Sequence, residues 1–88
     1  MKYFHTNYEG LTMYYSVFDL LLKHAKELDM SETELYEHFQ KRKFRKRTMD
    51  AFRNPGVTGT PSQQAHFLEF LGISELELHL LLGNIPEE

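Results

Sequence analysis

The sequence predicts an all-α protein that folds as a five-helix bundle. Three observations predict this class: apolar residues recur at helical spacing, two Ser-x-x-Glu motifs have the form of capping boxes, and glycine and proline residues separate the later segments. A chain of 88 residues is long enough for one hydrophobic core. We expect a single domain over residues 1–88, with an N-terminal arm (1–11), a helical bundle (12–83) and a tail (84–88).

Two helices are predicted in the first half of the chain. The first runs from Thr12 to Leu28, where apolar side chains repeat every three or four residues. The second begins after Ser31, because the Ser31 hydroxyl can accept a hydrogen bond from the Glu34 amide while the Glu34 carboxylate returns to the cap amide. This helix is short, and it carries Leu35 and Phe39 on one apolar face.

The third predicted helix lies in the basic stretch of residues 41–53. Met49 and Phe52 fit one helix face, while Phe44 fits a residue buried at or just before the helix start. The sequence Asn-Pro-Gly at 54–56 ends the helix, because proline disfavours helical geometry in the residue before it.

The fourth and fifth predicted helices are separated by Gly72. The fourth opens at Pro61 or Ser62 and ends at Gly72, since glycine favours the left-handed geometry that closes many helices. Its expected apolar stripe consists of Ala65, Leu68 and Leu71, flanked by Phe67 and Phe70. The fifth follows a capping box of Ser74 and Glu77. Its apolar residues, before Gly83 ends it, are Leu78, Leu81 and Leu82.

The charges of the chain are separated along its length. Seven of the ten Lys and Arg residues lie between positions 41 and 53 beside one acid, Asp50, whereas the rest of the chain has three bases and twelve acids. The net charge of −3 therefore conceals one local site for polyanions. The cations of this site are Lys41, Arg42, Lys43, Arg45, Lys46, Arg47 and Arg53.

Several functional classes find no support in the sequence. The absence of cysteine removes disulfides, thiolate nucleophiles and cysteine-ligated zinc. Glu34 and His38 share a helix face, but two ligands do not make a metal site. Because no nucleophile with its base, phosphate-binding glycine loop or dinucleotide motif is present, we expect no enzyme activity and no cofactor. The chain also lacks a secretory signal and a membrane-spanning run, so we expect a cytoplasmic protein.

The order of these elements resembles the lambda-repressor-like, Cro-type helix-turn-helix DNA-binding domains. The resemblance covers roughly residues 16–83, through DLLLKHAKELDMS, SETELYEHF, FRKRTMDAFRNPG and PSQQAHFLEFLGIS with ELELHLLLG. The most typical part is the end of the fourth helix with the Gly-Ile-Ser that follows it, which resembles the family in Ala65, Leu68, Leu71, Gly72, Ile73 and Ser74. The resemblance implies a small, non-enzymatic transcriptional regulator that binds double-stranded DNA, such as phages and mobile elements carry.

On this resemblance, the basic stretch contains the recognition helix. The helix would run from Arg45 to Arg53, and its first residues would enter the major groove, where Arg can donate two parallel hydrogen bonds to guanine. Cations of the preceding turn would contact phosphates. The groove-entering residues are Arg45, Lys46, Arg47 and Thr48, and the phosphate contacts are Lys41, Arg42 and Lys43.

The turn before this helix departs from the family pattern. The family has a tight turn, whereas Gln40 to Lys43 separate Phe39 from Phe44 and make the turn about three residues longer. Either the second helix runs longer or the turn bulges. In both cases the recognition helix can be tilted away from the usual docking angle.

Other interpretations of the basic stretch stay open at the level of sequence. It can be a solvated helix face, or it can bind an acidic protein partner. The chain would then be a protein-interaction module that modulates its partner without sequence-specific DNA binding. RNA binding would need Phe44 or Tyr36 to be exposed for stacking on bases, and we expect Phe44 to be buried.

Two surfaces are candidates for a homodimer contact, which proteins of the resembled family use to bind paired half-sites. The N-terminal arm carries Tyr3, Phe4 and Tyr8, more aromatic surface than a free tail normally exposes, so it should pack on its own domain or pair with a second copy. The apolar last helix is the other candidate.

Overall fold

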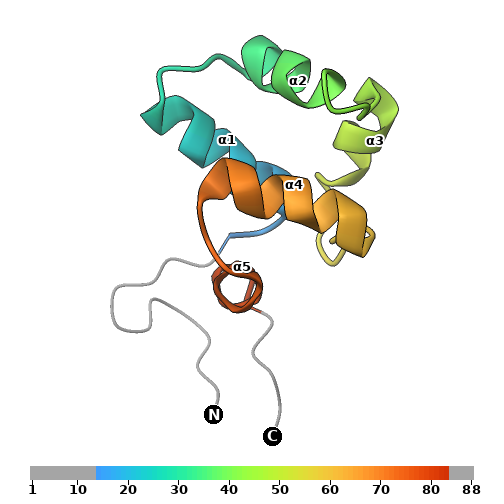
Figure 1. The fold of residues 1–88 in the computed structure, drawn as a ribbon. Helices are drawn as coiled ribbons and strands as arrows, with labels where there is room; N and C mark the ends of the chain where they lie inside the picture. Colours follow the sequence, from blue (N-terminus) through green and yellow to red (C-terminus); the bar gives the residue numbers. More distant parts are fainter. Residues whose placement is uncertain (1–13, 84–88) are drawn as a thin grey trace, which may run out of the picture.

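The protein is all-α in the computed structural model, which describes residues 14–83. Its helices are α1 (Val17–Glu27), α2 (Glu32–Gln40), α3 (Lys46–Ala51), α4 (Pro61–Leu71) and α5 (Glu75–Leu81). Figure 1 shows α1 to α4 enclosing a common centre, with α5 beyond α4 at one end of the molecule. The five-helix prediction is therefore confirmed, while the expected arm (1–11) and tail (84–88) lie outside the described residues.

Side-chain caps fix the starts of four helices. Both predicted capping boxes are present: Ser31 and Glu34 exchange hydrogen bonds of 3.1 and 2.8 Å, and Ser74 and Glu77 bonds of 3.2 and 2.8 Å. A third box, Thr60 with Gln63, starts α4. Each cap satisfies amides that the first helical turn leaves without a partner.

The first helix begins five residues later than the sequence pattern predicts. Ser16 caps it by accepting a hydrogen bond from the Asp19 amide at 3.1 Å, so that Val17 is the first helical residue. The preceding segment is held by another element, because the Tyr14 amide donates to the Leu81 carbonyl of α5 at 2.7 Å. The predicted start at Thr12 is therefore wrong.

Phenylalanine rings from four elements meet in the core. Phe39 of α2, Phe52 after α3 and Phe67 of α4 are each at most 2% exposed, and Phe44 in the turn before α3 is 4% exposed. Ring centroids lie 5.6 Å apart for Phe39 and Phe67 and 4.8 Å apart for Phe52 and Phe67, in edge-to-face arrangements that aromatic pairs favour. The predicted burial of Phe44, Met49 and Phe52 is confirmed.

The buried face of α4 differs from the predicted stripe. Ala65 is exposed and Leu68 is half-buried, whereas Phe67 and Leu71 face the core. The reason is packing against α2 and α3, since the Phe67 ring touches Phe39, Phe44 and Phe52 and this contact sets the rotation of the helix. Similarly, Leu78 of α5 is fully buried, so it is not available for the dimer contact that the sequence suggested.

The long turn before α3 is an extension of α2 and not a bulge. After Gln40 the chain continues for one further turn, and Lys43 then adopts a left-handed backbone with φ of 71°. The Lys43 amide donates to the Gln40 carbonyl at 2.9 Å and the Phe44 amide to the Phe39 carbonyl at 3.0 Å. These two bonds, with the contact of Phe39 and Phe44 rings at 5.3 Å, form a Schellman motif.

Candidate nucleic-acid interface

Six cations surround the junction between α2 and α3. Three of them lie in the extended end of α2 and three at the start of α3, where Arg45 is the N-cap and Lys46 the first helical residue. All are exposed except Arg42, which is half-buried. Phe44, in the middle of the six, is buried against α4, so the backbone that carries the cations is anchored to the core. We call these six residues the basic junction: Lys41, Arg42, Lys43, Arg45, Lys46 and Arg47.

Most charges of the basic junction are not neutralised by the protein itself. Among residues 14–83, only Lys46 of the six forms an ion pair, at 3.4 Å from the exposed Asp50 carboxylate. Arg42 donates to the His38 carbonyl at 2.9 Å, which uses one of its five donors. Five cations of the basic junction therefore have no carboxylate partner in the described part of the chain.

Arg53 differs from the other predicted site residues because it is bound within the protein. Its guanidinium donates to the Glu32 carboxylate at 2.6 Å and to the Tyr36 hydroxyl at 2.8 Å, and lies 4.0 Å from the centroid of the Phe18 ring. It also pairs with Asp50 at 3.5 Å. These bonds raise the pKa of Arg53, first through the Tyr36 hydroxyl and then through Glu32. Arg53 therefore has a structural role, while its expected role as a DNA contact stays a prediction.

Tyr36 and Asp50 connect the C-terminal half of α3 to α2. The Tyr36 hydroxyl donates to the Asp50 carboxylate at 2.5 Å, which holds the pKa of Asp50 below its ordinary value. Burial, followed by the bond to Asp50, raises the pKa of Tyr36. Together with Arg53, these bonds fix the angle between α2 and α3 and so the direction in which the start of α3 points. We call Glu32, Tyr36, Asp50 and Arg53 the polar clamp.

Most bonds of the polar clamp join residues that are far apart in the sequence. Asp50 and Arg53 are three residues apart and their pairing can be read from helical spacing, but Glu32 lies 21 residues from Arg53. Thr48, predicted to enter the groove, is half-buried on α3. The groove-entering residues that remain fully exposed are Arg45, Lys46 and Arg47.

Charge changes sign along α2. Its first half carries three exposed acids, Glu32, Glu34 and Glu37, whereas its extended end carries the first three cations of the basic junction. A polyanion is therefore attracted to one end of α2 and repelled from the other. The acids define one boundary of the candidate interface.

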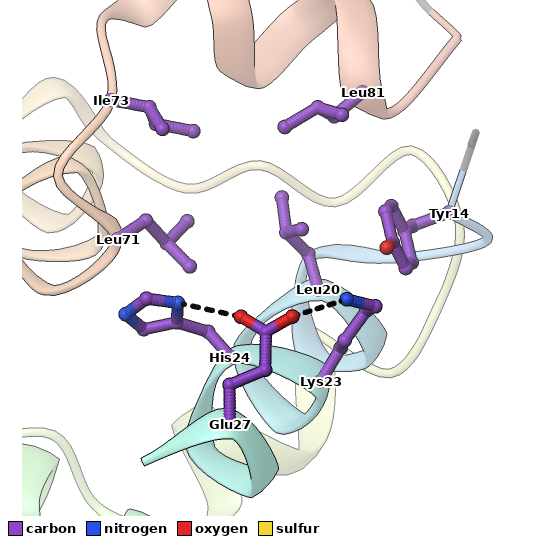
Figure 2. A pocket seen from close by; sticks show the side chains of 8 residues that line it. All are labelled: Tyr14, Leu20, Lys23, His24, Glu27, Leu71, Ile73 and Leu81. Atoms are coloured by element: carbon purple, nitrogen blue, oxygen red, sulfur yellow. Dashed lines mark hydrogen bonds and ion pairs between the residues drawn. The ribbon is translucent and has the colours of Figure 1, made fainter. Parts of the chain in front are cut away.

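A separate hollow, shown in Figure 2, differs from the basic junction because its charges are paired with one another. It has a volume of about 140 Å³ and lies among α1, α4 and α5, with Leu20, Leu71, Ile73 and Leu81 around it. Its only cation with a long side chain, Lys23, is bound to Glu27 at 2.5 Å, and this bond raises the pKa of Lys23. His24 lies 3.5 Å from the same carboxylate. The rim is thus neutralised, and this hollow is not a site for polyanions.

Residues 14–83 contain no group of three or more His, Cys, Asp or Glu side chains that could hold a metal ion. No helix in this range is long and apolar enough to cross a membrane.

Comparison with known proteins connects part of this chain to a larger enzyme. The chain is 34% identical over 73 residues to the type II methyltransferase M.BamHI of Bacillus amyloliquefaciens. The aligned stretch is 83% of this chain but 17% of the methyltransferase, so the chain spans about one sixth of that protein. No family model matches the chain, and no solved structure is significantly similar to it.

Proposed function

We propose that this chain is a DNA-binding domain of helix-turn-helix type, a transcriptional regulator that contacts duplex DNA through the basic junction. The observation that carries the proposal is that most of these cations are not paired with carboxylates of the protein. Five of the six have no carboxylate partner among the described residues, although the protein is acidic overall and acids are exposed on the neighbouring half of α2. Unpaired cations on an anchored backbone form a site for a polyanion.

The proposed contacts divide into two kinds. Lys41 and Lys43, with Arg42, neutralise phosphates and release counterions, which adds affinity without sequence information. The start of α3 carries Arg45 and Arg47, whose planar guanidinium groups can each donate two hydrogen bonds to guanine in the major groove. Base reading then depends on very few side chains, because α3 has six residues and Asp50 is engaged by Tyr36.

The polar clamp supports this mode of binding. A recognition element reads bases only if it is held within a fraction of an ångström of its working position. Arg53 joins the end of α3 to Glu32 of α2 and to the Phe18 ring of α1, and the Phe52 carbonyl accepts from the Phe18 amide at 3.1 Å. Two helices, α1 and α2, therefore hold α3 from the end opposite to the proposed DNA contact.

The similarity to the methyltransferase supports the interpretation of the chain as a module. Since the aligned stretch is 17% of that enzyme, the similarity concerns a small part of it, and methyl transfer is not proposed for this chain. A homodimer is a further part of the proposal, through the arm or through α5, on which Leu76 is 56% exposed.

The second candidate function is a protein-interaction module that binds an acidic partner through the same cations. The observation that favours it is the extension of α2, which places Lys41 to Lys43 beyond the point where a tight turn would end. In that case the start of α3 need not enter a groove.

Single alanine variants on a selected duplex test the proposal. A preferred site is first isolated from a random duplex pool, and binding to it is compared with binding to a scrambled duplex. Arg45→Ala and Arg47→Ala are expected to lose about 1 to 3 kcal/mol of discrimination. Lys41→Ala is expected to weaken both duplexes alike, and Lys26→Ala, an exposed lysine of α1, is the matched control. Equal losses on both duplexes for all basic-junction variants would mean that no base is read, and no binding to either duplex would favour the second candidate.

A further inference from the structure

A second polar hollow adjoins the basic junction on the side of α4. It has a volume of about 310 Å³ and lies between the extended end of α2 and the first half of α4. The side chains around it are Arg42, Lys43, Phe44, Ser62, Gln63 and His66. No local sequence pattern connects these α4 residues to a turn about 20 residues earlier.

The walls of this hollow are held in place by the core. Phe44 is buried, and His66 packs edge-on against its ring with 5.7 Å between centroids. Arg42 is tethered through its bond to the His38 carbonyl, which leaves its other donors unused by the bonds within the described chain. The backbone of Lys43 is fixed by the Schellman motif. The polar groups therefore converge without a need for large rearrangement.

The composition of the hollow suits an anion. It combines two cations with a hydroxyl, an amide and an imidazole, and no carboxylate lines it. Two other hollows each include an acid, Glu27 in the one of Figure 2 and Glu69 in the one beside His38. Arg, Lys, Ser and Gln side chains are the groups that most often contact nucleic-acid phosphates.

We propose that this hollow binds a phosphodiester group of the duplex, so that the first half of α4 belongs to the interface. This inference rests on the proposed function and extends it to Ser62 and His66. The bound strand would pass from the start of α3 to the start of α4, and away from the acidic half of α2, where Glu34 and Glu37 would repel it. The extension of α2 would then contribute to binding, because it supplies Arg42 and Lys43 to the hollow.

A pair of matched charge variants tests this inference in the chain of 88 residues. Ser62→Glu places a carboxylate in the hollow, while Thr33→Glu adds the same charge on α2. Both residues are exposed and occupy the second position of their helices, where an acid is favourable for the helix, so both variants should fold. The measurement is binding to a fluorescent duplex over a range of salt concentration, with thermal unfolding as a check of the fold.

The hollow predicts different results for the two variants. Ser62→Glu should bind the duplex roughly tenfold more weakly at low salt, with a log-log salt slope about one unit less steep, while Thr33→Glu should keep the slope of the unchanged protein. His66→Ala should weaken binding several-fold, and His24→Ala, which alters the hollow of Figure 2, should not. Equal binding by Ser62→Glu and Thr33→Glu would overturn the inference.

The outcomes separate this inference from the proposed function. If Arg45→Ala weakens duplex binding but Ser62→Glu does not differ from Thr33→Glu, the hollow is not a phosphate site and the proposed function stands. If the unchanged protein fails to bind the duplex, or binds poly-glutamate equally well at the same salt, both are wrong. Loss of binding in Ser62→Glu and in Arg45→Ala, with Thr33→Glu unaffected, supports both.

Discussion

Replacement of Lys43 by glycine should make the protein more stable and, at the same time, a weaker DNA binder. Lys43 closes α2 with φ of 71°, a left-handed backbone that costs a non-glycine residue about 1 to 2 kcal/mol. Glycine relieves this cost but gains about 0.5 to 1 kcal/mol of backbone freedom in the unfolded state. The net gain in the free energy of unfolding is therefore about 0.5 to 1 kcal/mol, or roughly 2 to 8 °C in Tm for a domain of this size.

The effect on binding has the opposite sign because Lys43→Gly also removes a cation of the basic junction. If Lys43 neutralises one phosphate, the log-log salt slope becomes about 0.9 less negative, which corresponds to roughly eightfold weaker binding at about 0.1 M salt. Asp29→Gly is the matched control. Asp29 ends α1 in the same left-handed geometry, with φ of 60°, but it is an exposed acid outside the basic junction.

Two assays separate the parts of this prediction. Thermal or chemical unfolding should show both glycine variants at or above the stability of the unchanged protein, with the smaller gain for Asp29→Gly, since aspartate tolerates this geometry better than lysine does. Duplex titration should show weaker binding for Lys43→Gly only. A destabilised Lys43→Gly variant would refute the Schellman geometry of the turn, and a stabilised variant with unchanged binding would refute the phosphate contact.

Two further predictions concern the groups that position the basic junction. Arg53→Met keeps the apolar stem but removes the bonds to Glu32 and Tyr36, so it should lower the free energy of unfolding by about 1 to 2 kcal/mol in unfolding curves. In paired duplex titrations it should weaken base discrimination more than nonspecific binding. Unchanged discrimination would mean that the polar clamp does not orient α3. The pKa of His38 is held below its ordinary value of 6.5 by burial and by Arg42 and Lys41, although Glu69 opposes this, so the unfolded state takes up the proton first as the pH falls. The His38 contribution to stability is therefore complete above pH 6.5 and is lost as the pH falls from 6.5 through the folded-state pKa. In unfolding curves, a His38→Gln variant should lose less stability over this pH range than the unchanged protein. An equal loss of stability would contradict the assignment to His38.

Features that depend on neighbouring residues were predictable from the sequence, and features that depend on tertiary contacts were not. The capping boxes at Ser31 and Ser74 involve residues three apart, so the starts of α2 and α5 were predicted correctly. The start of α1 was not, because apolar residues continue the helical period before Ser16 while the Tyr14 amide is paired with α5. The predicted buried face of α4 was wrong at Ala65, because the contacts of Phe67 in the core determine the rotation of the helix.

The same distinction between local features and tertiary contacts applies to the candidate site. The concentration of cations in residues 41–53 is visible in the sequence, and so are the two alternatives for the long turn. The choice between them was not, because Lys43 holds the left-handed position that glycine usually marks. Nor was the pairing of Arg53 with Glu32, since Glu32 belongs to another helix.

The salt dependence of duplex binding by the unchanged protein tests the central claim most directly. Neutralisation of five or six phosphates by the basic junction predicts a log-log slope of about −4 to −6 per monomer. A slope near zero, or no duplex binding at low salt, would contradict the claim that these cations meet nucleic acid.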